Sequence, residues 1–159
     1  MNLFGVMETS GSAMQAERMR AEVVAANMAN AETTRTESGG PYRRQMVVFA
    51  ADQGNAGFAD TLVNASVGAG SGGPPGLNSD KVGPGVQIAQ VVEDPAPPLK
   101  RYDPSHPDAG PDGYVAYPDI NPLTEMVDLM GATRAYGLNG SAVQAEKTMI
   151  ASALDIAKA

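Results

Sequence analysis

The chain has 159 residues, with 18 glycines, 12 prolines, no cysteine and a formal net charge of −7. This length allows one ordinary domain, and the lack of cysteine excludes disulfides and thiolate metal sites. No basic segment points to nucleic-acid binding, and no apolar run reaches the roughly 18 residues that a membrane-spanning helix needs.

Residues 3–32 are predicted to form one helix of about 30 residues. Apolar or small residues recur there at intervals of three and four, which is typical of a narrow stripe for packing against another helix. The threonine-rich run after Glu32 and then Gly39-Gly40-Pro41 end the helix. The stripe comprises Leu3, Met7, Ser10, Met14, Glu17, Ala21, Val24 and Met28.

Residues 35–120 are predicted to form a small β-rich middle domain. Strands are expected at residues 42–50, at 86–93 and at 114–117, the last directly after the tight-turn pair Asp112-Gly113. Within this domain, residues from about 52 to 84 consist largely of Gly, Ala, Ser, Asn and Pro. Such a composition cannot bury enough surface to offset its ordering entropy, so a flexible or partner-ordered insertion is expected.

Residues 121–159 are predicted to form a second long helix, with Asn121 as its N-cap and Pro122 in its first position. Glycines at positions 131, 137 and 140 each cost about 1 kcal/mol of helix stability, which suggests close approach by a neighbouring helix. The stripe of this helix comprises Met126, Leu129, Thr133, Tyr136, Gly140, Val143, Ile150, Leu154 and Ala157.

These elements predict an α+β fold in which two long terminal helices, within residues 1–34 and 121–159, pair as a coiled-coil-like hairpin domain. Helices of roughly 50 Å cannot both be covered by a small β module, so part of each helix is expected to face other molecules. The alternative is a soluble helical adaptor or coiled-coil binding module, whose ends would fold in isolation.

Two patterns that resemble chemical sites lack the context that the chemistry requires. The glycines of residues 68–73 match the dinucleotide fingerprint, but Pro74-Pro75 prevents the helix that must follow it. Glu93-Asp94 is interpreted as a solvated strand end rather than as an acid/base pair.

His106 is the only histidine, and it lies between Asp103 and Asp108. A metal site or a Ser-His-Asp triad would have to use it, but no second histidine, cysteine or marked nucleophile accompanies it. We therefore expect an exposed turn here, and no enzyme activity, metal or cofactor.

The run from Ala25 to Arg35 resembles the signature that closes the first helix of the bacterial flagellar axial proteins, which form the rod and hook. Its matching residues are Asn27, Ala29, Asn30, Thr33 and Arg35, whereas Ala26 and Met28 replace the usual Asn and Ile. Further motifs in the same order narrow the resemblance to the proximal rod: Gly39–Gln45, Val91–Pro95, Tyr102–Pro107, Gly113–Pro118 and Glu125–Leu129.

The resemblance implies a structural subunit of the periplasmic proximal rod, the drive shaft for motility that transmits torque and encloses the export channel. It implies type III export without a cleaved signal peptide, in agreement with an N-terminus whose first positive charge is Arg18. The expected partners are copies of the chain and other rod proteins, and beyond these the inner-membrane ring or export gate and the outer bushing ring. The expected assembly interface comprises Leu3, Met7, Met14, Ala21, Val24, Met28, Met126, Leu129, Tyr136, Gly140, Val143, Ile150 and Leu154.

Overall fold

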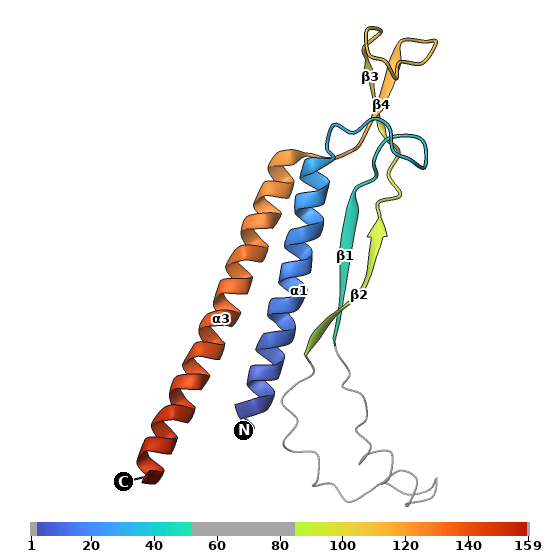
Figure 1. Cartoon of the computed structure of the whole chain (residues 1–159). Helices are drawn as coiled ribbons and strands as arrows, with labels where there is room; N and C mark the ends of the chain where they lie inside the picture. The colour runs from blue at the N-terminus through green and yellow to red at the C-terminus, as the bar shows by residue number, and fades with distance from the viewer. Residues whose placement is uncertain (1–2, 52–84, 159) are drawn as a thin grey trace, which may run out of the picture.

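The structure is a computed structural model that describes residues 3–51 and 85–158, with side chains from Gly5 onward. Helices α1 (Leu3–Ala29) and α3 (Pro122–Lys158) pack side by side and antiparallel, which confirms the predicted α+β fold with paired terminal helices (Figure 1). The insertion expected at about 52–84, with the glycine pattern of residues 68–73, lies outside the described residues, as does the side chain of Leu3.

Helix α1 ends at Ala29, three residues before the predicted end. The last helical bond runs from the backbone N of Asn30 to the carbonyl of Ala26 at 3.1 Å, and the Asn30 side-chain Nδ2 donates to the same carbonyl at 2.9 Å. The backbone N of Thr33 then donates to the Asn30 carbonyl and turns the chain. The side chain of Asn30 also accepts from Thr33 Oγ1 at 3.2 Å, so local side-chain bonds accompany the turn that ends the helix.

Helix α3 begins as predicted. The Asn121 side-chain Oδ1 accepts from the backbone N of Leu123 at 3.0 Å, and the Asn121 carbonyl accepts from the N of Glu125. The 37 residues of α3 span roughly 55 Å, against roughly 40 Å for the 27 residues of α1. The C-terminal part of α3 therefore extends beyond the start of α1 (Figure 1).

The seam between the two helices is built from small and polar side chains. The buried residues of α3 are Glu125, Ala132 and Glu146, and those of α1 are Ser10, Ala16, Val24 and Asn27. The buried hydrophobic residues of the described chain are only Ala16, Val24, Val115, Ile120 and Ala132. The helix pair is therefore held with little apolar burial of its own.

Two separate two-stranded antiparallel sheets follow α1. Strands β1 (Gln45–Ala51) and β2 (Val86–Glu93) pair with a bulge at Val48/Phe49 and lie along α1 on the side away from α3 (Figure 1). Strands β3 (Leu99–Tyr102) and β4 (Tyr114–Tyr117) form the second hairpin, which projects past the end of the helix pair. The predicted bounds of β2 and β4 are confirmed, and β1 begins three residues later than expected.

Strand β3 was not predicted, because prolines flank it and its four exposed residues show no alternation. Its existence depends on pairing with β4 across the turn that Gly113 closes. The backbone N of Gly113 donates to the Gly110 carbonyl at 2.9 Å, and the Gly113 carbonyl accepts from the N of Asp103. Gly113 has φ +74°, and a Cβ there would lie 2.8 Å from Cε2 of Tyr102.

We expect Gly113→Ala to destabilise the β3–β4 hairpin by about 1–3 kcal/mol, because it adds left-handed backbone strain and a steric clash with Tyr102. Gly40→Ala is the matched control, since Gly40 has φ +87° but no atom within 4 Å of its added Cβ. Amide exchange across residues 99–117 checks the prediction. If Gly40→Ala reduced the protection of its own loop as much as Gly113→Ala reduces that of residues 99–117, the steric clash with Tyr102 would not be the cause.

Candidate functional site

A buried polar cluster joins the end of α1, the start of β1 and the start of α3, and we call it the junction. At its centre is Asn27, whose side chain is only 1% exposed. Its Nδ2 donates to the Gln45 carbonyl at 2.8 Å and to Glu125 Oε2 at 3.0 Å. Its Oδ1 accepts from the Gln45 N at 2.9 Å and from the Tyr42 hydroxyl at 3.3 Å. All the hydrogen-bonding capacity of the amide is used.

Glu125 is the acidic member of the junction and is also 1% exposed. Its Oε1 accepts from Arg44 Nε at 2.6 Å, while its Oε2 accepts from Asn27. A buried carboxylate is strongly destabilising unless it is paired and hydrogen-bonded. The first turn of α3 can therefore dock only where both Asn27 and Arg44 are in place.

A chain of charges continues from the junction along the helix seam. Arg44 Nη2 lies 3.7 Å from Asp128 Oδ2, and Arg20 Nη2 donates to Asp128 Oδ1 at 3.3 Å. Arg20 Nη1 lies 3.6 Å from Glu17 Oε2. Of these partly buried pairs, Arg20–Asp128 joins α1 to α3, Arg44–Asp128 joins the segment before β1 to α3, and Arg20–Glu17 lies within α1. The acidic Asp128 near the start of α3 also suits the helix dipole.

Tyr42 closes the junction beside Gln45. Burial raises the pKa of its hydroxyl above the ordinary value, and the nearby Glu93 and Glu125 carboxylates raise it further. The neutral hydroxyl is the form that donates to Asn27, so this environment favours the bonded state.

A second tie fixes the projecting hairpin to the loop after α1. Thr34 Oγ1 donates to Asp108 Oδ2 at 2.8 Å, and Arg35 Nη1 lies 3.7 Å from Asp108 Oδ1. His106 Nδ1 accepts from the Asp108 N, and its ring lies edge-on to Tyr117. The histidine thus shapes a turn, and the described ranges contain no group of three metal-ligating side chains.

The residues of the signature run occupy different parts of this region. Asn27 is at the centre of the junction, Asn30 and Thr33 end α1, and Arg35 pairs with Asp108, whereas Ala29 is exposed. Arg44, Glu125 and Asp128 lie within motifs that carry the family resemblance. Nothing in the sequence indicated that Arg44 pairs with Glu125 and Asp128, about 80 residues further along the chain.

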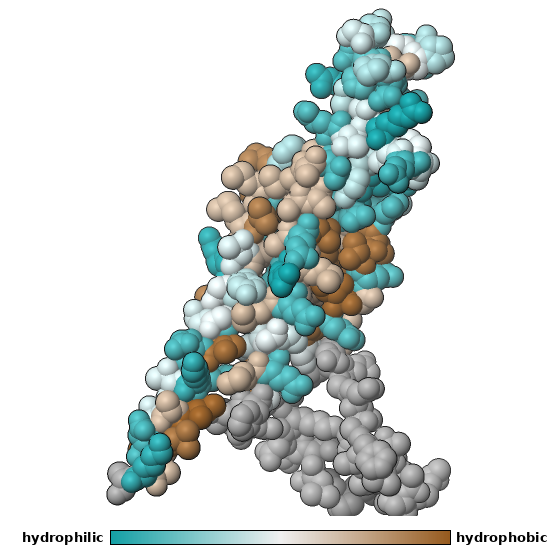
Figure 2. Space-filling model, viewed as in Figure 1, coloured by the Kyte–Doolittle hydropathy of each residue, from teal (hydrophilic) through white to brown (hydrophobic). Residues whose placement is uncertain are grey.

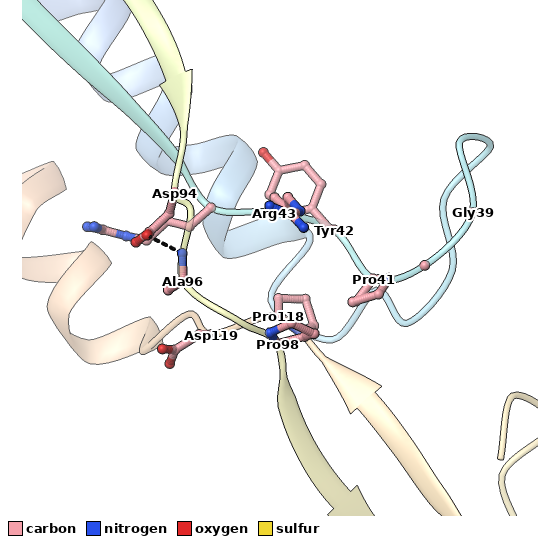
Figure 3. Close-up of a pocket in the computed structure, with 11 residues that line it drawn as sticks. Gly39, Pro41, Tyr42, Arg43, Asp94, Ala96, Pro98, Pro118 and Asp119 are labelled. Atoms are coloured by element: carbon pink, nitrogen blue, oxygen red, sulfur yellow. Dashed lines mark hydrogen bonds between the residues drawn. The ribbon is translucent and has the colours of Figure 1, made fainter. Parts of the chain in front are cut away.

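A cavity of about 170 Å³ lies beside the junction (Figure 3). Asp94 Oδ1 accepts from the Ala96 N at 2.9 Å on one wall, which ends β2 in a turn. Its other walls come from the Gly39–Arg44 loop and from Pro118-Asp119, just before α3. Glycine, proline and backbone atoms make up much of the lining, so the cavity marks where three chain segments cross.

The expected interface residues divide between covered and open positions. On α1, Val24 is buried, and Met7, Met14, Ala21 and Met28 are half-buried. On α3, Leu129, Gly140, Val143 and Ile150 are half-buried, whereas Met126, Tyr136 and Leu154 are exposed. The buried residues of α3 are Glu125, Ala132 and Glu146, and the first two each lie one position before a residue of the stripe. The role of the stripe in assembly stays a prediction.

The sequence analysis missed a further apolar surface on α3, which we call the outer stripe. It lies on the side of the helix away from the seam, with exposure from 57% at Met130 to 77% at Ile156. Its members are spaced by three or four residues or by multiples of these, and this spacing is the signal in the sequence that could have identified the surface. The outer stripe comprises Leu123, Val127, Met130, Leu138 and Ile156. Among the described residues, no helix is long and apolar enough to cross a membrane.

Two family models match the regions that meet at the junction. The model for the flagella basal body rod protein matches residues 7–35, and that for the C-terminal part of the flagellar basal body rod FlgEFG proteins matches residues 112–156. Asn27 lies in the first region, and Glu125 and Asp128 lie in the second.

Similar proteins carry the name flagellar basal-body rod protein FlgC. The protein from Borreliella burgdorferi is 35% identical over 98% of both chains, and that from Bacillus subtilis is 38% identical over 99% of this chain and 100% of its own. The protein from Escherichia coli O157:H7 is 33% identical over 98% of both chains. The chain belongs to the FlgC family of flagellar basal-body rod proteins.

Proposed function

We propose that this chain is a structural subunit of the flagellar rod that assembles through its terminal helices. Membership of the family implies a place in the basal body among other rod and basal-body proteins. In this proposal the subunit belongs to the periplasmic proximal rod, transmits torque and helps to enclose the export channel. It reaches the rod without a cleaved signal peptide and packs on copies of itself and on other rod proteins. The inner-membrane ring or export gate and the outer bushing ring are further proposed neighbours.

The observation that carries this proposal is the uncovered apolar surface of α3. In the described part of the chain, nine of the 16 exposed large hydrophobic residues lie on this one helix. Residues 151–158, beyond the start of α1, are exposed throughout. Apolar surface of this extent on a single element marks an interaction site, which favours a subunit over a self-sufficient adaptor.

The junction gives the subunit a second property that a drive shaft needs. Its hydrogen bonds join both terminal helices to the strand that leads into the β hairpins. A force applied to the hairpins therefore reaches the helix pair through buried bonds rather than through a free linker.

The function itself is tested by amide exchange on the free chain and on assembled rods. We expect residues 151–158 to exchange rapidly in the free chain, because they are exposed throughout and lie beyond the start of α1, and to be protected in the rod. Full protection of these residues in a dilute monomer would favour the adaptor instead.

Asn27→Asp tests the junction. It removes both amide donors and places a second carboxylate against Glu125, so we expect a loss of about 3 kcal/mol or more in the free energy of unfolding. Asn30→Asp, the same change one turn along and partly exposed, should cost about 1 kcal/mol or less. Urea unfolding and swimming assays measure both variants. Similar losses for the two would show that the junction does not hold the helices.

Gly140→Leu tests the predicted interface. No atom lies within 4 Å of the Cβ position at Gly140, so the first carbon of an added side chain has room in the free chain, and the loss of the glycine should raise helix stability by up to about 1 kcal/mol. A neighbouring subunit that approaches this glycine would be blocked, and motility would be lost. Gly140→Ala should give a milder defect. Normal swimming by Gly140→Leu would remove position 140 from the interface.

A further inference from the structure

A shallow groove of about 470 Å³ lies between α1 and β2, on the other side of α1 from α3. Its floor is apolar, and Figure 2 shows hydrophobic residues gathered over this part of the β1–β2 hairpin. Met19 and Val91 are exposed there although both are large and apolar. The apolar lining residues are Met19, Val23, Ala26, Val91 and Val92.

The polar rim of the groove is acidic. Glu22 and Glu93 both line it, and Gln45 completes the polar part. Glu93 is exposed and has no ion pair within the described part of the chain. Glu22 pairs with Arg18, but that pair is exposed on both sides, so solvent weakens it and a better partner can replace it.

The outer stripe of α3 has the complementary chemistry. Met130, Arg134 and Leu138 follow one another at intervals of four residues, so they lie along one side of the helix. All three are exposed, and Arg134 has no ion pair within residues 3–51 and 85–158. A single cation thus lies between two large apolar side chains.

The two surfaces also match in length. The groove residues of α1 run from Met19 to Ala26, which corresponds to roughly 10 Å along the helix axis, and Met130 to Leu138 spans roughly 12 Å. Helix α3 makes no contact with β2 in its own chain, so the stripe and the groove cannot meet within one copy.

We propose that the groove receives the outer stripe of a second copy of this chain, with Met130 and Leu138 on the apolar floor and Arg134 on Glu93. This inference rests on the proposed function, because it names which surfaces of neighbouring subunits meet. Each copy contributes a stripe on one side and a groove on the other. The contact is therefore head-to-tail and can continue from copy to copy, as a rod requires.

A charge exchange tests the pairing in a strain whose only copy encodes the full chain. Arg134→Glu and Glu93→Arg should each weaken the contact by roughly tenfold or more and reduce swimming, because each places like charges together. The double variant restores one opposite pair at every contact, so swimming should return. Normal swimming by either single variant, or no recovery in the double variant, would overturn the pairing.

Disulfide cross-linking tests the geometry independently, and the cysteine-free chain gives no background. The double variant Val91→Cys with Leu138→Cys, oxidised within assembled basal bodies, should yield dimers and longer ladders of this chain. Tyr102→Cys with Leu138→Cys is the control, because Tyr102 is more exposed than Val91, at 65% against 43%, but lies on the projecting hairpin. It should yield no ladder.

The outcomes separate this inference from the proposed function. Rods that contain the chain but give no Val91 to Leu138 link overturn only the inference. A link from Val91→Cys to a different rod protein overturns the choice of a second copy. Basal bodies that never contain the wild-type chain overturn the proposed function itself.

Discussion

The structure depends on one buried hydrogen bond, between the amide of Asn27 and the carboxylate of Glu125. The two residues are 98 positions apart, and neither has access to water. A buried charge that loses a partner destabilises a protein by several kcal/mol, whereas a complete set of partners makes the same charge tolerable. Because Arg44 supplies the remaining partner, α1, α3 and the segment before β1 must be in position together.

This arrangement explains how a helix pair with little apolar burial keeps a defined register. Small residues such as Ala16 and Ala132 let the two backbones lie close, but they provide little sequence-specific information. The polar residues at one end supply it, since a shift of α3 by one turn would leave Glu125 buried without Asn27 or Arg44. Register is thus set at the junction, and the rest of the seam follows.

The sequence predicted what depends on local signals and missed what depends on distant pairing. Asn121-Pro122 located the start of α3, and Asp112-Gly113 located the turn before β4, because caps and turns are decided by adjacent residues. Strand β3 carries no such signal and forms only by pairing. The stripe expected on α3 consists of apolar and small residues, whereas the buried positions of this helix include the charged Glu125 and Glu146, which an apolar pattern does not indicate.

When polar and small residues face the partner helix within the chain, the large apolar residues of α3 remain on the outside, from Leu123 at 70% exposure to Ile156 at 77%. The same residues can bury their surface when a neighbouring molecule covers them, so the free energy gained from apolar burial falls on the contact between subunits. Polar bonds fix the fold inside each chain, and in the assembly that we propose hydrophobic contacts hold the chains together.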